Sequence, residues 1–361
     1  MTNSPPCEAG TGVGPQAWVL VAKGKMAKRQ VDPGSIASFP SQLRVCPKFV
    51  GICSADLREF QGKRSGRRLF GHELVGQIAG KRDCPGYEIG DWVTLNPNID
   101  VFRTSGFAQL ICSGSKSPEQ LARAWPRLDP MTVSPNMVFI EPLAVAIHCA
   151  TLIPPHTSRS GRVLVIGAGF FGTLIALACH HFGLHTTITN RSAGRLRFLE
   201  ERGFGQQLEI RPFDAVQSHY EVVVLATASL DQAALDTAFH CSAEQATIVI
   251  FSGTKPGLTC SKTGAEIDTV RTQELLSDVK AVGKSLKLQG SYGATSSDFS
   301  SAEAMLCDEE FAAKLQKIVV GTVPFDQLGE FFETVDRQGT LGKMLLDLKH
   351  DLRAKSGEHH A

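Results

Sequence analysis

The sequence lacks several features that would assign it to particular classes of protein. It has no Cys-x-x-Cys pair, and its ten cysteines do not have the spacing of a disulfide framework. The N-terminal residues show neither the basic nor the apolar region of a signal peptide, and no apolar run is long enough to cross a membrane. The formal net charge of +1 gives no reason to expect a nucleic acid or an anionic membrane as a partner. We therefore expect a soluble cytoplasmic protein with reduced cysteines.

The composition is that of a globular protein with a full core. The 361 residues are 42% hydrophobic and 20% charged, and this length favours two domains. The first region is mainly β, with short apolar segments separated by glycine-rich corners, as in a partly open barrel. The expected strands are residues 17–22, 43–46, 48–50 and 73–80, and residues 87–95 are expected to form a turn followed by a strand. Residues 1–15 are rich in Gly, Pro, Ser and Thr and are expected to be loosely attached.

A glycine-rich turn follows a buried strand in the second region. The apolar run 162–166 predicts a parallel strand, and residues 173–179 continue as a helix. Between them lies a Gly-x-Gly-x-x-Gly turn, which in this context predicts a dinucleotide-binding unit with its pyrophosphate at the helix N-terminus. The predicted contact residues are Gly167, Gly169, Phe170, Phe171 and Gly172.

The next strand predicts which dinucleotide is bound. Residues 186–189 form that strand, and a unit that binds NAD usually places Asp or Glu directly after it. Here Asn190 stands in that place, and Arg191 could pair with a 2′-phosphate. Ser192 and Arg195 could assist, so we expect a preference for NADP(H) over NAD(H).

Strands and helices continue to alternate along the chain. Residues 221–226, 246–251 and 287–289 are expected strands with helical stretches between them, such as 231–240. This order predicts an α/β fold with a doubly wound parallel sheet. A long polar excursion, 252–284, interrupts it, and loops of this length often cover a site or meet a partner.

A thiol, an imidazole and a carboxylate occur close together in the first region. Cys53, His72 and Glu73 are a plausible mixed ligand set for zinc, and Glu141 is a later fourth candidate. The alternative is a small buried cysteine near an unrelated His-Glu pair. His148 lies on a predicted helix that begins near Glu141. We interpret it as a core or surface histidine whose hydrogen bonds are satisfied by neighbouring groups, rather than as a ligand.

Taken together, these motifs resemble the zinc-dependent medium-chain dehydrogenase/reductase family, in particular its polyol branch of sorbitol, threonine and sugar dehydrogenases. The resemblance extends from about residue 17 to residue 348. The motifs that carry it occur in the family's order: Gly51-Ile-Cys53-x-x-Asp56, Gly71-His-Glu-x-x-Gly76, Glu141-Pro-Leu-Ala144, Gly167-x-Gly-x-x-Gly172, Gly290-Ser-Tyr-Gly293 and Gly342-Lys343.

The resemblance implies a catalytic domain that is split in sequence. A GroES-like, mainly β domain would comprise residues 1–150 and 287–361, with a Rossmann domain, 151–286, inserted into it and the active cleft between the two. Cys53 and His72 would bind one catalytic zinc ion. Glu73 and Glu141 would ligate it directly or hold its water, and Asp56 would orient a ligand histidine. The family also leads us to expect a homodimer or homotetramer.

Three departures from the family pattern affect the predicted chemistry. The segment after Pro97 lacks the four cysteines that hold a structural zinc in many relatives. Ala55 stands where relatives often carry a Ser or Thr that begins a proton relay, and Arg58 replaces a relay histidine. Ser54 is adjacent, but its side chain should point elsewhere if the segment follows β alternation. The proton would then leave through zinc-bound water, Glu73, a substrate hydroxyl or solvent.

The resemblance implies reversible oxidation of a secondary alcohol of a sugar, cyclitol or amino-polyol, with hydride transfer to NADP. Two alternatives stay open. One is a zinc-free double-bond or quinone reductase of the same wider family, against which the retention of Cys53, His72 and Glu141 argues. The other is a non-catalytic scaffold that binds a cofactor, which the loss of both relay groups favours.

Overall fold

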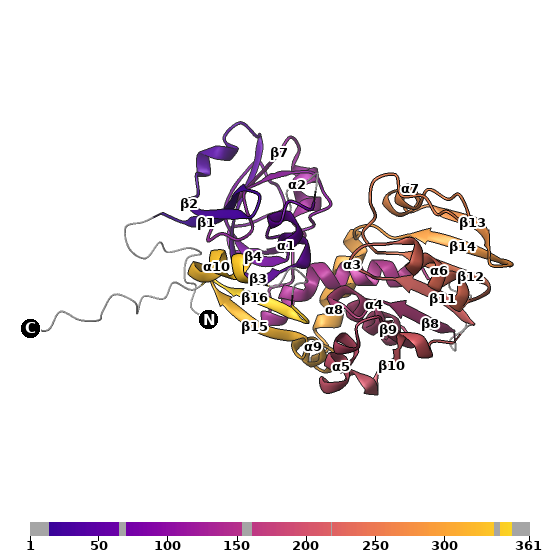
Figure 1. The fold of residues 1–361 in the computed structure, drawn as a ribbon. Helices are drawn as coiled ribbons and strands as arrows, with labels where there is room; N and C mark the ends of the chain where they lie inside the picture. The colour runs from indigo at the N-terminus through magenta and orange to yellow at the C-terminus, as the bar shows by residue number, and fades with distance from the viewer. Residues whose placement is uncertain (1–13, 65–69, 154–160, 218, 336–339, 349–361) are drawn as a thin grey trace, which may run out of the picture. The chain divides into compact units, whose positions relative to one another are not determined.

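The chain forms two compact units. The computed structural model describes residues 14–64, 70–153, 161–217, 219–335 and 340–348, so most of the stretch expected to be loosely attached, residues 1–15, lies outside the described residues. One unit comprises residues 1–141 and 309–361, and the other comprises residues 142–308 (Figure 1). These limits differ from the expected domain limits at 150 and 286. The expected limit at 286 would divide the strand at 284–290, which belongs to the sheet of the second unit.

The second unit is built on a seven-stranded sheet with the order β10-β9-β8-β11-β12-β14-β13. All neighbouring pairs are parallel except β13 and β14. The strands are β8 (Arg162–Ile166), β9 (His185–Asn190), β10 (Glu209–Pro212), β11 (Tyr220–Leu225), β12 (Ser242–Ile250), β13 (Leu276–Ala281) and β14 (Lys284–Gly290). The helices are α3 (Ile140–Thr151, beginning at the unit boundary), α4 (Phe170–His181), α5 (Ala193–Glu201), α6 (Gln232–Cys241), α7 (Ile267–Thr272) and α8 (Ser296–Leu306).

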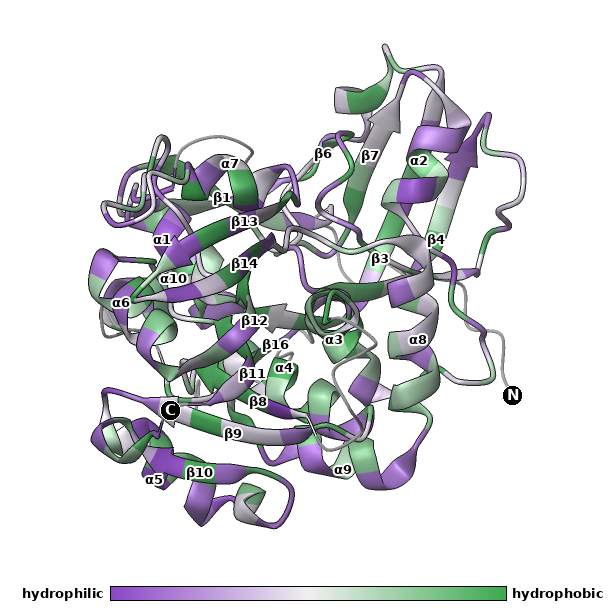
Figure 2. Ribbon diagram, turned by 90° about the vertical axis from the view of Figure 1, so that its right-hand side faces the viewer, coloured by the Kyte–Doolittle hydropathy of each residue, from purple (hydrophilic) through white to green (hydrophobic). Residues whose placement is uncertain are grey.

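The central strands of this sheet are buried, which explains their apolar sequences. Val163, Leu164 and Val165 of β8 are fully buried, as expected for a parallel strand that is covered on both faces. Helix α4 is buried from Gly172 to Cys179, which agrees with its hydrophobic colouring in Figure 2. The predicted doubly wound sheet is confirmed. The excursion expected at 252–284 instead contains helix α7 and edge strand β13. Leu276 and Val279 of β13 are three positions apart and lie on opposite faces, so the segment shows neither an apolar run nor the alternation of a half-buried strand.

The first unit is mainly β, as predicted. Its main sheet has the order β15-β16-β3-β4-β5, with β7 paired to β3 and to β6, and β1 and β2 form a separate hairpin. The strands are β1 (Gln16–Ala22), β2 (Lys25–Gln30), β3 (Ser41–Ile52), β4 (Leu74–Arg82), β5 (Trp92–Thr94), β6 (Phe102–Arg103), β7 (Ile111–Ser115), β15 (Val319–Pro324) and β16 (Lys343–Asp347). The helices are α1 (Ser54–Phe60), α2 (Pro118–Ala124), α9 (Glu309–Gln316) and α10 (Leu328–Thr334).

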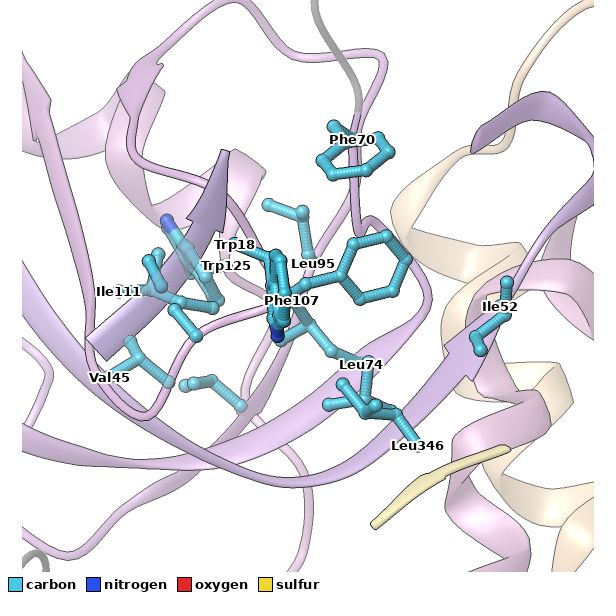
Figure 3. Close-up of a cluster of buried hydrophobic side chains, with 14 of the residues drawn as sticks. Trp18, Val45, Ile52, Phe70, Leu74, Leu95, Phe107, Ile111, Trp125 and Leu346 are labelled. Atoms are coloured by element: carbon cyan, nitrogen blue, oxygen red, sulfur yellow. The ribbon is translucent and has the colours of Figure 1, made fainter. Parts of the chain in front are cut away.

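The C-terminal part of the chain completes this unit. Strand β16 pairs antiparallel with β3, so that Met344 lies opposite Ile52. Leu346 of β16 belongs to the same buried cluster as Trp18, Phe107 and Trp125 (Figure 3). Burial of these side chains in one core explains why two distant stretches of sequence form a single unit.

Two local features differ from expectation. The residues after Cys53 form helix α1, so β alternation does not apply to Ser54. Cys46 is disulfide-bonded, which the cysteine spacing did not predict. Within the described ranges, no helix has the length and apolar character needed to cross a membrane.

The core of the first unit provides a stability prediction. Phe332 on α10 is 2% exposed, and its ring contacts those of Phe60, Phe70 and Phe107. We expect Phe332→Ala to lower the free energy of unfolding by about 3–5 kcal/mol, because a buried aromatic leaves a large cavity. Phe331 on the same helix is only partly buried, so Phe331→Ala is the matched control and should cost less. Equal losses in urea unfolding of the two variants would contradict this description of the core.

Candidate metal and dinucleotide sites

Cys53 lies where β3 ends and α1 begins. It is the N-cap residue of α1, and Asp56 is the third residue of that helix. The Asp56 carboxylate accepts a hydrogen bond from the backbone N–H of Cys53 at 2.8 Å and another from Gly71 at 2.9 Å. One buried carboxylate therefore fixes the start of α1 against the segment that carries His72.

His72 is directed by the same carboxylate. Its Nδ1 lies 3.3 Å from Asp56 Oδ1, and its ring also hydrogen-bonds Cys53. Gly71, immediately before it, has a φ of 68°, and a Cβ there would lie 2.5 Å from the backbone nitrogen of Phe107. Only glycine fits this position without displacement, so the turn that directs His72 into the interior depends on it.

The thiol and the imidazole perturb each other's protonation. Burial would raise the pKa of Cys53, but the hydrogen bond and charge of His72, together with the charge of Lys343, lower it to about 7. Burial would lower the pKa of His72, but the charge and hydrogen bond of Asp56 and the interactions with Cys53 raise it well above its ordinary value. The thiolate, which is the form that binds metals, is therefore favoured at this position.

Glu73 is a buried carboxylate held by a partner that is distant in sequence. Its Oε2 accepts a hydrogen bond from Lys343 Nζ at the start of β16, and both side chains are at most 2% exposed. A Cβ at Gly51 would lie 2.7 Å from Glu73 Oε2 and 2.9 Å from Lys343 Cε, so this pair occupies the space beside a glycine. Glu73 Oε1 is buried without a hydrogen-bond partner.

These residues together form a possible metal-binding cluster. Cys53, His72 and Glu73 each offer one ligand atom, and the three atoms lie within 4.8 Å of one another. Glu141, at the start of α3, is 4% exposed, and its Oε2 has no hydrogen-bond partner. Burial raises the pKa of Glu141 to about 7; His72 opposes the rise, whereas Cys53 and Asp56 add to it. The Glu141 carboxyl is thus within electrostatic range of the cluster.

The positions that depart from the family pattern lie on α1. Ala55 is buried and has no polar group, and Arg58 lies in the last turn of the helix. The sequence motifs found the cluster, but they gave no role to Lys343. Its contact with Glu73 joins residues that are 270 positions apart.

The glycine-rich turn of the second unit joins β8 to α4. Gly167 has a φ of 125°, and a Cβ there would lie 2.5 Å from the Ala226 carbonyl oxygen. A Cβ on Gly172 would lie 1.7 Å from the Gly167 carbonyl oxygen, so helix and strand could not approach as closely. Gly169 caps the N-terminus of α4, and a Cβ there would have Arg195 Nη1 as its nearest neighbour, at 3.8 Å. These contacts fit the roles that the motif predicts for the three glycines.

The residues expected to select the cofactor lie at the end of β9. Asn190 Oδ1 accepts a hydrogen bond from the backbone N–H of Ala168, at 3.2 Å, inside the glycine-rich turn. Arg191 has an exposed side chain whose Nη2 is 3.8 Å from Asp231 Oδ2. Ser192 caps α5 without a side-chain hydrogen bond. Phe171 packs on Phe170 and on Phe251 after β12.

Comparison with known proteins identifies the fold. A family model described as "Shikimate / quinate 5-dehydrogenase" matches residues 151–250, which contain the glycine-rich turn. No curated protein matches the sequence.

Solved structures match nearly the whole chain. Galactitol-1-phosphate dehydrogenase from Escherichia coli is 16% identical, with a TM-score of 0.69, and the match covers 92% of this chain and 99% of that one. S. aureus TarJ in complex with NADPH is 17% identical, with a TM-score of 0.67 and coverages of 92% and 98%. L-idonate 5-dehydrogenase from Escherichia coli is 18% identical, with a TM-score of 0.63 and coverages of 92% and 97%. The chain therefore has the fold of the medium-chain dehydrogenases/reductases, as its motifs predicted.

The buried ion pair beside the cluster gives a second prediction. Lys343→Met should leave Glu73 as an unpaired buried charge and lower the free energy of unfolding by about 3–5 kcal/mol. The double variant Lys343→Met/Glu73→Gln removes both charges and should recover part of that loss. Urea unfolding of the two single variants and the double variant measures the coupling. Strictly additive losses would show that the pair contributes no interaction energy.

Proposed function

We propose that the protein is a zinc-dependent alcohol or polyol dehydrogenase that transfers hydride between a secondary alcohol and NADP. The supporting observation is the buried cluster of Cys53, His72 and Glu73. The fold that the chain shares with galactitol-1-phosphate and L-idonate dehydrogenases supports a sugar, cyclitol or amino-polyol as substrate. Oxidation of the alcohol would yield a carbonyl compound, NADPH and a proton.

The donor set fits zinc. A thiolate, an imidazole and carboxylates are all zinc ligands, and a catalytic site keeps one position open. The unpartnered buried oxygens Glu73 Oε1 and Glu141 Oε2 support a cationic group at this position, because most buried carboxylate oxygens have hydrogen-bond donors. Cys53 and His72 would hold the ion, with oxygens from the two glutamates. We infer a single catalytic zinc, since the segment after Pro97 contains no cysteine cluster.

Bound zinc would act as a Lewis acid that polarises the substrate oxygen and lowers the pKa of its hydroxyl. Asp56 would keep His72 oriented through Nδ1, and Lys343 would restrain one oxygen of Glu73. Ala55 cannot accept a proton, and Arg58 stays protonated at neutral pH. Proton release would therefore use Glu73, a substrate hydroxyl or water rather than a relay along α1.

The second unit would bind the cofactor. The turn from Gly167 to Gly172, including Phe170 and Phe171, would take the pyrophosphate. Asn190, Arg191, Ser192 and Arg195 would surround the 2′-phosphate, and none of them carries the carboxylate that would repel it. We infer that the first compact unit acts as the catalytic part and that the second, whose sheet includes β14, acts as the dinucleotide-binding part. We also infer that the enzyme works as a homodimer or homotetramer in the cytoplasm.

Metal content tests this proposal directly. We expect a single zinc ion per chain by elemental analysis, activity that chelation abolishes and zinc restores, and no retained zinc in Cys53→Ser. The activity assay follows nicotinamide absorbance across a panel of polyols. Full activity of the metal-free protein would favour the zinc-free reductase. Bound zinc and NADPH without turnover of any polyol or carbonyl compound would favour the scaffold.

Cofactor preference gives a separate prediction. Arg191→Ala should raise the Kd for NADPH by about tenfold to a hundredfold, as expected for loss of a hydrogen bond to a charged group, and leave the Kd for NADH unchanged. Arg197→Ala, an exposed arginine on α5, is the matched control. An equal effect of Arg191→Ala on both cofactors would contradict recognition of the 2′-phosphate.

A further inference from the structure

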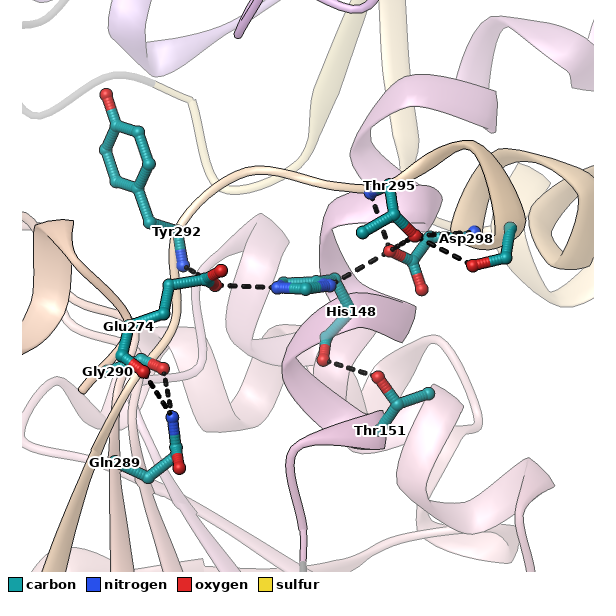
Figure 4. Close-up of polar contacts among 9 residues, drawn as sticks. His148, Thr151, Glu274, Gln289, Gly290, Tyr292, Thr295 and Asp298 are labelled. Atoms are coloured by element: carbon teal, nitrogen blue, oxygen red, sulfur yellow. Dashed lines mark hydrogen bonds and ion pairs between the residues drawn. The ribbon is translucent and has the colours of Figure 1, made fainter. Parts of the chain in front are cut away.

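A buried histidine in the second unit links three elements that are far apart in sequence. His148 on α3 is 8% exposed. Its Nδ1 lies 2.9 Å from Asp298 Oδ2 on α8, and its Nε2 lies 2.7 Å from Glu274 Oε1, between α7 and β13 (Figure 4). A neutral imidazole carries one N–H donor, whereas both nitrogens here face carboxylate oxygens. The arrangement therefore suits the imidazolium, which donates to both.

The two carboxylates also hold the loop between β14 and α8. Glu274 Oε1 accepts the backbone N–H of Tyr292 at 2.8 Å, and Asp298 Oδ2 accepts the backbone N–H of Thr295 at 2.7 Å. Thr295 is the N-cap residue of α8 and forms a capping box with Asp298. A single imidazole thus connects the two groups that fix the two ends of the loop 291–295.

This loop lies at the same edge of the sheet as the glycine-rich turn. In the strand register, Gly290 lies beside Ile250, Ile250 beside Leu225, and Leu225 beside Ile166. Gly167 follows Ile166, and Ser291 follows Gly290, so both segments leave the carboxyl edge of the parallel sheet. Ligands of open α/β sheets bind outside this edge.

We propose that His148 is a positioning residue for the dinucleotide: as an imidazolium, it clamps the loop 291–295 in the shape that binds the cofactor. The inference rests on the proposed function for its cofactor. The clamp itself depends only on the contacts among His148, Glu274, Asp298 and the two loop amides. The cofactor would contact the loop and not His148, whose ring nitrogens are both occupied.

The charges around His148 set the pH at which the clamp is released. The hydrogen bond to Asp298, and the hydrogen bond and charge of Glu274, raise the pKa of His148 to about 9, although its burial acts in the opposite direction. The charged groups that face it are Glu274 from the α7–β13 turn and Asp298 from α8. Cys149 on its own helix is also within reach of Glu274, and its pKa is raised by burial. Because the folded-state pKa is raised, the stabilisation is complete below the ordinary histidine pKa and is lost as the pH rises through about 9.

The first experiment tests the clamp without cofactor. Hydrogen exchange of the full chain, corrected for intrinsic rates, is compared for the wild type, His148→Gln and His185→Gln, the last being an exposed histidine on β9. We expect faster exchange at the Tyr292 and Thr295 amides in His148→Gln alone. The wild type should show the same change as the pH rises through about 9. Unchanged exchange at both amides in folded His148→Gln would overturn the proposal.

The second experiment tests the effect on binding. NADPH Kd is measured by fluorescence titration across the same pH range, with no need for zinc or turnover. His148→Gln should weaken binding by about tenfold and remove the pH dependence. Glu274→Gln keeps an oxygen for Tyr292 but removes a charge, so it should shift the midpoint to lower pH. Glu274→Gln also tests the proposal if His148→Gln fails to fold.

An unshifted midpoint of the pH dependence in Glu274→Gln would overturn the positioning role. So would an NADPH Kd equal to that of the wild type in His148→Gln, if hydrogen exchange shows that its loop is loosened. Absence of NADPH binding to the wild type would instead refute the proposed function, and hydrogen exchange would still test the clamp.

Discussion

The hydrogen bonds of the Asp56 carboxylate are the constraint on which the candidate metal site depends. This side chain is fully buried and accepts from the amides of Cys53 and Gly71, and it also contacts the ring of His72. A buried carboxylate is costly unless it is paired and hydrogen-bonded. Asp56 satisfies both conditions, and in doing so it brings the thiol at the end of β3 and the imidazole before β4 into contact.

The rest of the first unit surrounds this carboxylate with compensating interactions. Glu73, next to His72, would be an uncompensated buried charge without Lys343 from β16. The pairing of β16 with β3 is therefore more than the closure of a sheet, because it delivers a cation to the site from the far end of the chain. Two glycines make room for this arrangement: Gly51 beside the Glu73–Lys343 pair and Gly71 before His72.

The second unit uses the same physical principle with the opposite charge at the centre. There, a buried cationic histidine is compensated by two carboxylates, and the backbone groups they accept belong to the loop after β14. In both units, one buried ionised side chain organises segments that carry predicted ligand-binding groups. The sequence interpretation of His148 as a satisfied histidine is confirmed by its two partners.

The sequence predicted those parts of the structure in which local pattern and tertiary packing agree. β8 and the glycine-rich turn before α4 were recognisable because a buried apolar run, a turn and a helix each have a short-range signature. Helix α1 was missed, although Asp56 three residues after Cys53 is the spacing of a capping box. β13 was missed because its sequence has neither an apolar run nor a regular alternation of apolar and polar residues.

Other contacts have no local signature at all. The Lys343–Glu73 pair joins residues 270 positions apart, and the carboxylate partners of His148 are 126 and 150 positions away. Such contacts depend on how the sheets are assembled, which no short pattern specifies. The candidate ligands were therefore predictable from motifs, whereas the groups that hold and compensate them were not.

The central claim, that Cys53 and His72 bind one metal ion together, is tested most directly by the visible absorption spectrum of the chain reconstituted with cobalt(II). If both residues bind the ion, the spectrum shows the intense d–d bands of four-coordinate cobalt and a thiolate-to-cobalt charge-transfer band. The charge-transfer band is lost in Cys53→Ser, and the d–d bands change in His72→Ala. A weak octahedral spectrum that neither substitution alters would contradict it.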